Sequence, residues 1–185
     1  LDMVEDSEQT LYPRLGETES IKELTRLMIV RSSNLATNIL LETLGPRHVD
    51  AFVRTLGIEG VTVMRGVEDV AAFDRGMNNR ATARGLTQTM ELIAQGRVVS
   101  EQASQAMIDI LLRQEFNESI PAPLPDSVKV AHKTGWADVF FHDTGVVFRG
   151  DRAPYVLTIM TRGFAEDRAT EAHQCMASVS KAIYE

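Results

Sequence analysis

The sequence predicts an α+β fold, in which a helical lobe precedes an antiparallel sheet flanked by helices. Three observations lead to this prediction. Apolar side chains recur at helical spacing through most of residues 20–113, three β-rich runs lie between residues 128 and 161, and residues 165–183 return to helical spacing. A chain of 185 residues can form one domain, or one domain with a small lobe, without a disulfide to stabilise it.

The first part of the chain, residues 1–125, is expected to be a mainly helical lobe. Its first helix should begin at Ser20, because Ser20 and Glu23 have the spacing of a capping box. A long Ω-type loop over residues 58–81 interrupts the helices, and a loop of this length in a compact domain is usually functional. The other helices of the lobe are predicted over residues 35–44, 46–57, 82–95 and 100–113.

The second part, residues 126–185, is expected to be a three-stranded antiparallel sheet followed by a C-terminal helix. β-branched and apolar residues predict strands over residues 128–132, 144–148 and 155–161. A turn at Gly150-Asp151 should join the last two strands as a hairpin, and residues 165–183 form the final helix. We expect the two parts to form one catalytic unit together.

Composition excludes several classes of function. The net charge of −7 argues against a nucleic-acid partner, because neutralising phosphates requires a basic surface. No apolar run approaches the roughly 18 residues that a transmembrane segment needs. The single cysteine, Cys175, excludes a disulfide within the chain and a cysteine-based zinc site, and no histidine spacing typical of a metal site occurs. We therefore expect no metal and no cofactor.

Two short motifs carry the functional signal. Ser32-Ser33-Asn34 lies between two predicted helices, and His132-Lys133-Thr134-Gly135 ends the first predicted strand. Each tripeptide alone is weak, but their order, their separation and their structural context together are specific. They resemble the S-D-N and K-[ST]-G motifs of the penicillin-recognising serine acyltransferases, above all the class A β-lactamases. The resemblance covers nearly the whole chain and implies a β-lactamase/transpeptidase-like fold.

The resemblance implies a role for each residue of the two motifs. Ser32 would relay a proton to the leaving nitrogen, and Lys133 would tune Ser32 and attract a substrate carboxylate. Thr134, next to Gly135, would hydrogen-bond that carboxylate. The substrate side chain would be held by the amide of Asn34, and the backbone N–H of Trp136 would be one oxyanion donor. The substrate would be a small-molecule β-lactam or a peptidoglycan peptide, met in the periplasm or outside the cell.

The nucleophile of this family is missing from its usual place. The family's S-x-x-K motif precedes S-D-N by roughly sixty residues, more than this chain has before Ser32. We therefore expect a partner segment upstream of Leu1 to carry S-x-x-K, with the nucleophile roughly thirty residues before Leu1. The chain alone should then be inactive. Ser178-Val179-Ser180-Lys181 also matches the pattern, but it lies on an amphipathic terminal helix and is expected to be a chance match.

The long loop departs from the family pattern, and the departure leaves two functions open. Arg65 resembles the arginine that opens the family's Ω-loop, but the position two residues later is Val67 instead of the catalytic glutamate. Glu68 is the nearby candidate for the general base, and its alternative is a solvated loop charge. With a working base, the protein would be a serine β-lactamase-like hydrolase. Without one, it would be a penicillin-binding DD-peptidase, or an esterase-like protein, that acylates with slow turnover.

One further departure lies in the first motif, where Ser33 replaces the family's aspartate. The replacement removes a structural carboxylate from the corner between the two helices. We expect the geometry of that corner to differ from the family's.

Overall fold

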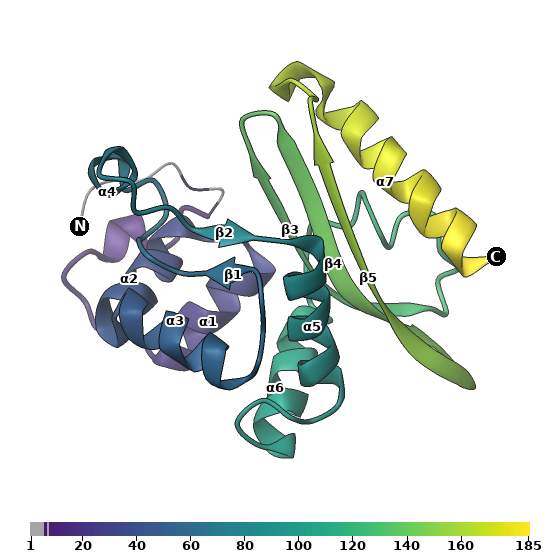
Figure 1. Ribbon diagram of the computed structural model, residues 1–185, viewed down its shortest axis with the longest axis horizontal. Helices are drawn as coiled ribbons and strands as arrows, with labels where there is room; N and C mark the ends of the chain where they lie inside the picture. The colour runs from purple at the N-terminus through teal and green to yellow at the C-terminus, as the bar shows by residue number, and fades with distance from the viewer. Residues whose placement is uncertain (1–5, 7) are drawn as a thin grey trace. The chain divides into compact units, whose positions relative to one another are not determined.

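The computed structural model describes Asp6 and residues 8–185 (Figure 1). The chain divides after Gly85 into two compact units, and each is described by itself. The α+β class predicted from the sequence is confirmed, because helices make up the first unit and an antiparallel sheet with flanking helices makes up the second. No helix within the described residues is long and apolar enough to cross a membrane.

The main helices of the first unit are α1 (Ile21–Val30), α2 (Asn34–Leu44) and α3 (Pro46–Thr55). A short 3-10 helix, η1 (Tyr12–Arg14), precedes them. The capping residue predicted from the sequence is confirmed, since the Ser20 hydroxyl accepts a hydrogen bond from the Glu23 N–H at 3.1 Å. Leucines from α1 and α2 interlock in the core with a leucine that precedes η1, and the buried set is Leu11, Leu24, Leu27, Leu35, Ala36 and Leu40.

The loop predicted over residues 58–81 contains more structure than the sequence suggested. β1 (Val61–Thr62) pairs antiparallel with β2 (Arg80–Ala81), and one short helix, α4 (Val70–Asp74), lies between them. The paired strands bring the two ends of the loop together at its base (Figure 1). Strands of two residues are too short to show a period-two pattern, which is why the sequence indicated only a loop.

The second unit is built around a three-stranded antiparallel sheet in the order β3-β4-β5. Its strands are β3 (Lys129–Ala137), β4 (Phe140–Arg149) and β5 (Arg152–Arg162). The helices are α5 (Ala83–Ala94), which starts at the unit boundary, α6 (Glu101–Leu111), which packs on β3, and α7 (Ala169–Tyr184), which follows the 3-10 helix η2 (Glu166–Arg168).

All three strands are longer than predicted, and the difference matters for the site. The first strand was expected to end at His132. In the structure β3 continues to Ala137, because every residue from Lys129 to Ala137 has a partner on β4. The Lys133-Thr134-Gly135 motif therefore lies inside an edge strand instead of after it.

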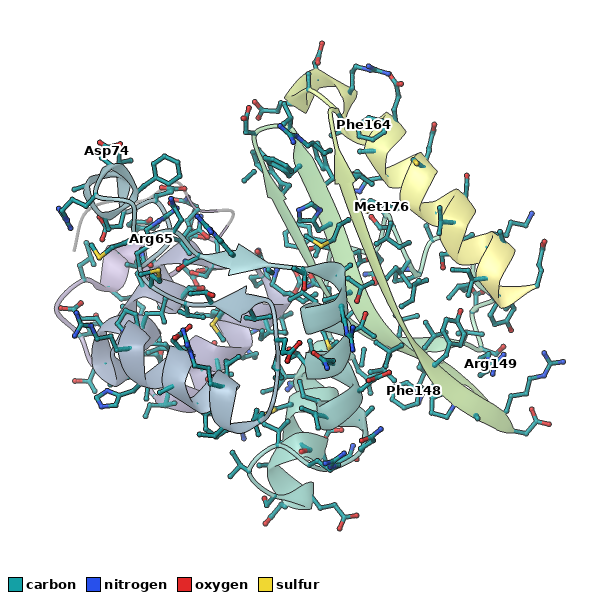
Figure 2. The ribbon with its side chains drawn as sticks, viewed as in Figure 1. Arg65, Asp74, Phe148, Arg149, Phe164 and Met176 are labelled. Carbon is teal, nitrogen blue, oxygen red and sulfur yellow. The ribbon has the colours of Figure 1, made fainter. Side chains whose placement is uncertain are left out.

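The two faces of the sheet have different surroundings. One face packs under α7, where Met176 lies between the helix and the strands (Figure 2). Phe141, Val147 and Leu157 belong to this core. On the other face, Thr87 of α5 donates a hydrogen bond to Thr158 of β5 at 2.9 Å. Because side chains alternate along a strand, neighbouring residues of β3 are divided between these two surroundings.

Candidate active site

The Ser32-Ser33-Asn34 motif forms the corner between α1 and α2. Ser32 has a φ of +56°, in the left-handed region that side chains other than glycine rarely adopt. Ser33 is fully buried and is the N-cap of α2, since its hydroxyl accepts the N–H of Ala36 at 3.1 Å. The backbone strain and the cap together present Ser32 and Asn34 on the outer side of the corner, where both are half-buried.

A carboxylate from elsewhere in the chain occupies this corner. Oδ2 of Asp6 accepts hydrogen bonds from the Ser33 hydroxyl and from the Leu35 N–H, each at 2.8 Å. A negative charge at the first turn of α2 also interacts favourably with the helix dipole. The sequence-based expectation was that the corner loses a structural carboxylate because residue 33 is serine. The structure corrects that expectation, since Asp6 supplies one through space.

Asn34 also reaches the long loop. Its Nδ2 donates to Oε1 of Glu68 at 3.3 Å, so a carboxylate lies beside an amide that the sequence assigns to substrate binding. Glu68 is exposed and has a φ of +59°, a second left-handed residue in the same unit. Non-glycine residues held in this region cost roughly 1–2 kcal/mol and cluster at functional sites.

The loop that carries Glu68 is fixed by a side-chain amide from α2. Nδ2 of Asn38 donates to the Val67 carbonyl at 3.0 Å, and the Val67 N–H donates to Oδ1 of Asn38 at 2.7 Å. Gly66, which precedes Val67, is required by this contact, because a Cβ at residue 66 would lie 2.7 Å from Oδ1 of Asn38. Asn34 and Asn38 are one helical turn apart, so a single face of α2 holds both the backbone of the loop and its carboxylate.

The side-chain amide of Asn79, near the end of the loop, bonds to the backbone near the start of the loop. Oδ1 of Asn79 accepts the N–H groups of Met64 and Arg65 at 2.7 and 3.1 Å, and its Nδ2 donates to the Arg65 carbonyl at 2.9 Å. The guanidinium of Arg65 lies over the ring of Phe73 at 5.5 Å, within the same loop. Neutral hydrogen bonds and a cation–π contact thus close the loop.

Lys133 lies on the face of the sheet that carries the threonines. In register it pairs with Thr144 of β4, and Thr144 pairs with Thr158 of β5. Burial lowers the pKa of Lys133 to about 8, and the charge of Asp143 acts in the opposite direction. Nζ of Lys133 donates to the Thr134 carbonyl at 2.6 Å. A half-buried ammonium of this kind attracts an anion more strongly than a fully solvated one.

The three residues after Lys133 form the open end of β3. Thr134 is half-buried, and Gly135 is exposed, with no atom of the described residues within 4 Å of the position of a Cβ. No contact with the described part of the chain therefore requires glycine at this position, and a glycine in a strand often marks the close approach of a ligand. Trp136 is 61% exposed and stacks on Phe141, with ring centroids 6.3 Å apart.

The structure brings some of the predicted site residues together. In the first unit Asn34 and Glu68 share a hydrogen bond next to Ser32, while Lys133, Thr134, Gly135 and Trp136 are consecutive in the second unit. Asp6 was missed, and no local pattern could reveal it because its contacts are long-range. Asn38 was also missed, although its spacing from Asn34 places both on one helix face. Among the described residues no cluster of side chains suited to a metal ion occurs.

The two serines of the S-x-x-K sequence on α7 make structural contacts. The hydroxyl of Ser180 is fully buried and donates to the Ile120 carbonyl at 2.8 Å. The hydroxyl of Ser178 donates to the carbonyl of Gln174 on the preceding turn. Both hydroxyl protons are therefore engaged by backbone carbonyls, which supports the interpretation of this sequence as a chance match.

Comparison with known proteins places the chain in a family. The model of the beta-lactamase enzyme family matches residues 2–185. The chain belongs to this family. Among curated relatives, the beta-lactamase of Streptomyces albus G is 28% identical over 82% of this chain. The carbapenem-hydrolyzing beta-lactamase KPC of Klebsiella oxytoca is 29% identical over 83% of it. The chain spans 50% and 54% of the lengths of these two family members.

Solved structures of the family confirm the fold. PBP-A superimposes with a TM-score of 0.83 at 26% identity, covering 98% of this chain and 68% of its own. The TLA-3 extended-spectrum beta-lactamase superimposes with a TM-score of 0.85 at 18% identity over 94% of this chain and 66% of its own, a likeness of fold alone. One PBP-A variant was solved as an acyl-enzyme complex with penicillin G. The chain thus has the class A beta-lactamase architecture over about two-thirds of those structures.

Proposed function

We propose that this chain supplies the substrate-contacting part of a serine β-lactamase-like hydrolase that acts on β-lactams through an acyl-enzyme. The nucleophile in this proposal is the serine of an S-x-x-K segment N-terminal to the chain, and the site of action is the periplasm or the cell exterior. Family membership and the acyl-enzyme of a PBP-A variant support the β-lactam as ligand.

The contact between Asn34 and Glu68 is the observation that carries the proposal. Hydrolysis of an acyl-enzyme requires a base that activates a water next to the ester. Glu68 lies within the loop, next to the residue that Asn38 holds, and its carboxylate accepts a hydrogen bond from Asn34. A merely solvated loop charge would not need a strained backbone and an amide partner from the neighbouring helix. We therefore assign Glu68 as the general base for deacylation.

The other residues take the roles that binding and acylation need. Ser32 passes the proton to the leaving nitrogen, and Asn34 holds the substrate's side-chain amide. Lys133 and Thr134 bind the carboxylate of the substrate, which approaches closely over Gly135. The N–H of Trp136 donates to the oxyanion, an interaction that contributes roughly 3–4 kcal/mol in comparable sites.

A DD-peptidase-like or esterase-like protein with slow turnover is the second candidate. Its supporting observation is the likeness to PBP-A, which covers 98% of the chain and of which a variant was solved as an acyl-enzyme complex with penicillin G. In this second function Glu68 does not activate water, and the acyl-enzyme persists. The two candidates therefore differ in one rate, that of deacylation.

Stopped-flow kinetics with a chromogenic cephalosporin separate the candidates in the complete protein. We expect the wild-type protein to turn over linearly, and Glu68→Gln to release about one product per site and then slow by about 10²–10⁴-fold, since a positioned base is lost. Intact-mass spectra should show a trapped adduct in Glu68→Gln only. Glu59→Gln, a change in the same unit outside the site, is the matched control and should behave as wild type.

Each other outcome selects a different conclusion. A burst and a trapped adduct in the wild-type protein would support the slow-turnover candidate instead. Acylation without any difference between wild type and Glu68→Gln would remove Glu68 from the mechanism. No acylation in any variant would contradict both candidates.

A further inference from the structure

A buried polar cluster lies on the α7 side of the sheet, directly behind the Lys133 motif. Nδ1 of His132 lies 2.9 Å from Oδ1 of Asp143, and the two side chains are 1% and 0% exposed. The sheet leaves room for His132 only because its partner in register is Gly145, where a Cβ would lie 2.6 Å from Cβ of His132. None of the roles proposed above uses this pair.

Every polar atom of the pair has a partner. Oδ2 of Asp143 accepts the Ile120 N–H at 3.0 Å. Nε2 of His132 lies 3.2 Å from Oδ1 of Asn117, whose Nδ2 donates to the Gln114 carbonyl at 3.0 Å. The pair therefore fastens the connection between α6 and β3 to the inner face of the sheet. A fully satisfied buried network of this kind holds one conformation rigidly.

The register places this cluster next to Lys133. His132 precedes Lys133 on β3, and Asp143 precedes Thr144, the partner of Lys133, on β4. The backbone of Lys133 is thus fixed from the buried face while its ammonium lies on the other face. The remaining ionisable groups on α6 and β4, the elements packed on β3, are exposed or half-buried: Glu101, Asp109, His142 and Arg149.

We propose that His132 and Asp143 are positioning residues for Lys133, which anchor its strand from behind and place a carboxylate on the face of the sheet opposite its ammonium. The proposal rests on the function proposed above only for the role of Lys133 in binding a substrate carboxylate. The anchoring of its strand follows from the structure of the sheet alone. Burial lowers the pKa of Lys133 and the charge of Asp143 raises it, which agrees with the proposal.

Replacing the carboxylate by its neutral isostere tests the charge. Asp143→Asn in the complete protein should lower the titration midpoint of Lys133, followed by ¹⁵N NMR at Nζ, by about half a pH unit or more from its value near 8. Lys133→Arg identifies the signal. Asp151→Asn in the exposed turn between β4 and β5 should leave Lys133 at the wild-type midpoint. An unchanged midpoint in folded Asp143→Asn would overturn the proposal.

Two further measurements test the anchoring role even if Asp143→Asn does not fold. His132→Gln removes the ring but keeps the carboxylate, and it should speed amide exchange at residues 132–134 by about tenfold or more. In the wild-type protein, NMR should detect a slowly exchanging proton on Nδ1 of His132. Unchanged exchange in His132→Gln, or a bare Nδ1 in the wild type, would contradict the anchoring role. None of these readouts requires turnover, so a failed hydrolase assay leaves them valid.

Discussion

Two residues of the first unit, Ser32 and Glu68, occupy left-handed backbone conformations that their side chains disfavour. Glycine would fit both positions with less strain. The chain instead carries a hydroxyl at one and a carboxylate at the other, the two groups that the proposed mechanism uses for proton transfer. At the residue scale, the proposed site is thus a place where stability is given up for chemistry.

This interpretation predicts that function and stability separate at Ser32. Ser32→Gly should raise the free energy of unfolding by up to about 1 kcal/mol, because it relieves the left-handed strain. The same variant should lose most acylation by β-lactams, because the proton relay is gone. Denaturant titration and burst amplitudes measure the two effects. Ser32→Ala is the control, which should lose acylation without the gain in stability. Acylation that survives in both variants would show that the hydroxyl is not used.

At the scale of the element, α2 organises the first unit. Its N-terminus is capped by Ser33 and held by Asp6, and its exposed face presents Asn34 and Asn38 to the loop. The same helix therefore sets the position of a substrate-binding amide and of the candidate base. A shift of the helix would move both groups together, whereas a change at Asn38 alone would free only the loop.

Asn38→Ala should therefore affect deacylation more than acylation. The variant loses both hydrogen bonds to Val67, so Glu68 is no longer held next to Asn34. We expect the steady-state rate to fall by about tenfold or more while the acylation rate changes little. Single-turnover kinetics separate the two steps. Thr43→Ala on the exposed side of α2 is the control, and equal losses in both steps would argue that Asn38 only stabilises the fold.

The sequence predicted most elements because local signals determine them. Ser20 caps its helix as expected, and the helices predicted from apolar spacing lie within a few residues of the observed ones. The strands were predicted too short, since pairing with β4 carries β3 through Gly135. Local pattern cannot report such pairing, nor the contact of Asp6 with Ser33, because both depend on residues distant in the chain.

The motifs of the candidate site could be predicted from the sequence, but the contacts that hold their residues in place could not. Lys133 and Asn34 belong to short patterns that can be recognised in the sequence. The position of Glu68 could not be inferred, because the loop carries one residue more between Arg65 and its carboxylate than the family pattern has. The His132–Asp143 pair was not predicted from the sequence. Its burial behind Lys133 follows from the strand register alone.

At the scale of the whole molecule, the lowered pKa of Lys133 sets the pH range for anionic ligands. A lysine with a pKa near 8 is cationic below that pH and neutral above it. Attraction of a substrate carboxylate should therefore be complete in mildly acidic solution and be lost as the pH rises through 8. A substrate without a carboxylate should not follow this change.

Acylation rates measured against pH test this expectation in the complete protein. With an anionic β-lactam, the second-order rate should fall by up to about tenfold per pH unit above the pKa of Lys133. A neutral ester should show no such fall. Lys133→Arg should extend the plateau for the anionic substrate, because a guanidinium stays protonated throughout this range. Parallel profiles for both substrates would show that Lys133 does not bind the carboxylate.

The carboxylate that Asp6 brings to the corner between α1 and α2 has a consequence for how such a corner can change during evolution. Ser33 and Asp6 are distant in the chain, and Asp6 places a carboxylate at the start of α2, where the family pattern has an aspartate at the position of Ser33. A lineage that lost the acid at one position before gaining it at the other would pass through an intermediate with an unsupported corner. Descent between the two arrangements should therefore run through ancestors that carried both acids. A comparison confined to the Ser32-Ser33-Asn34 motif would record the loss of a carboxylate that had only moved to another position in the chain.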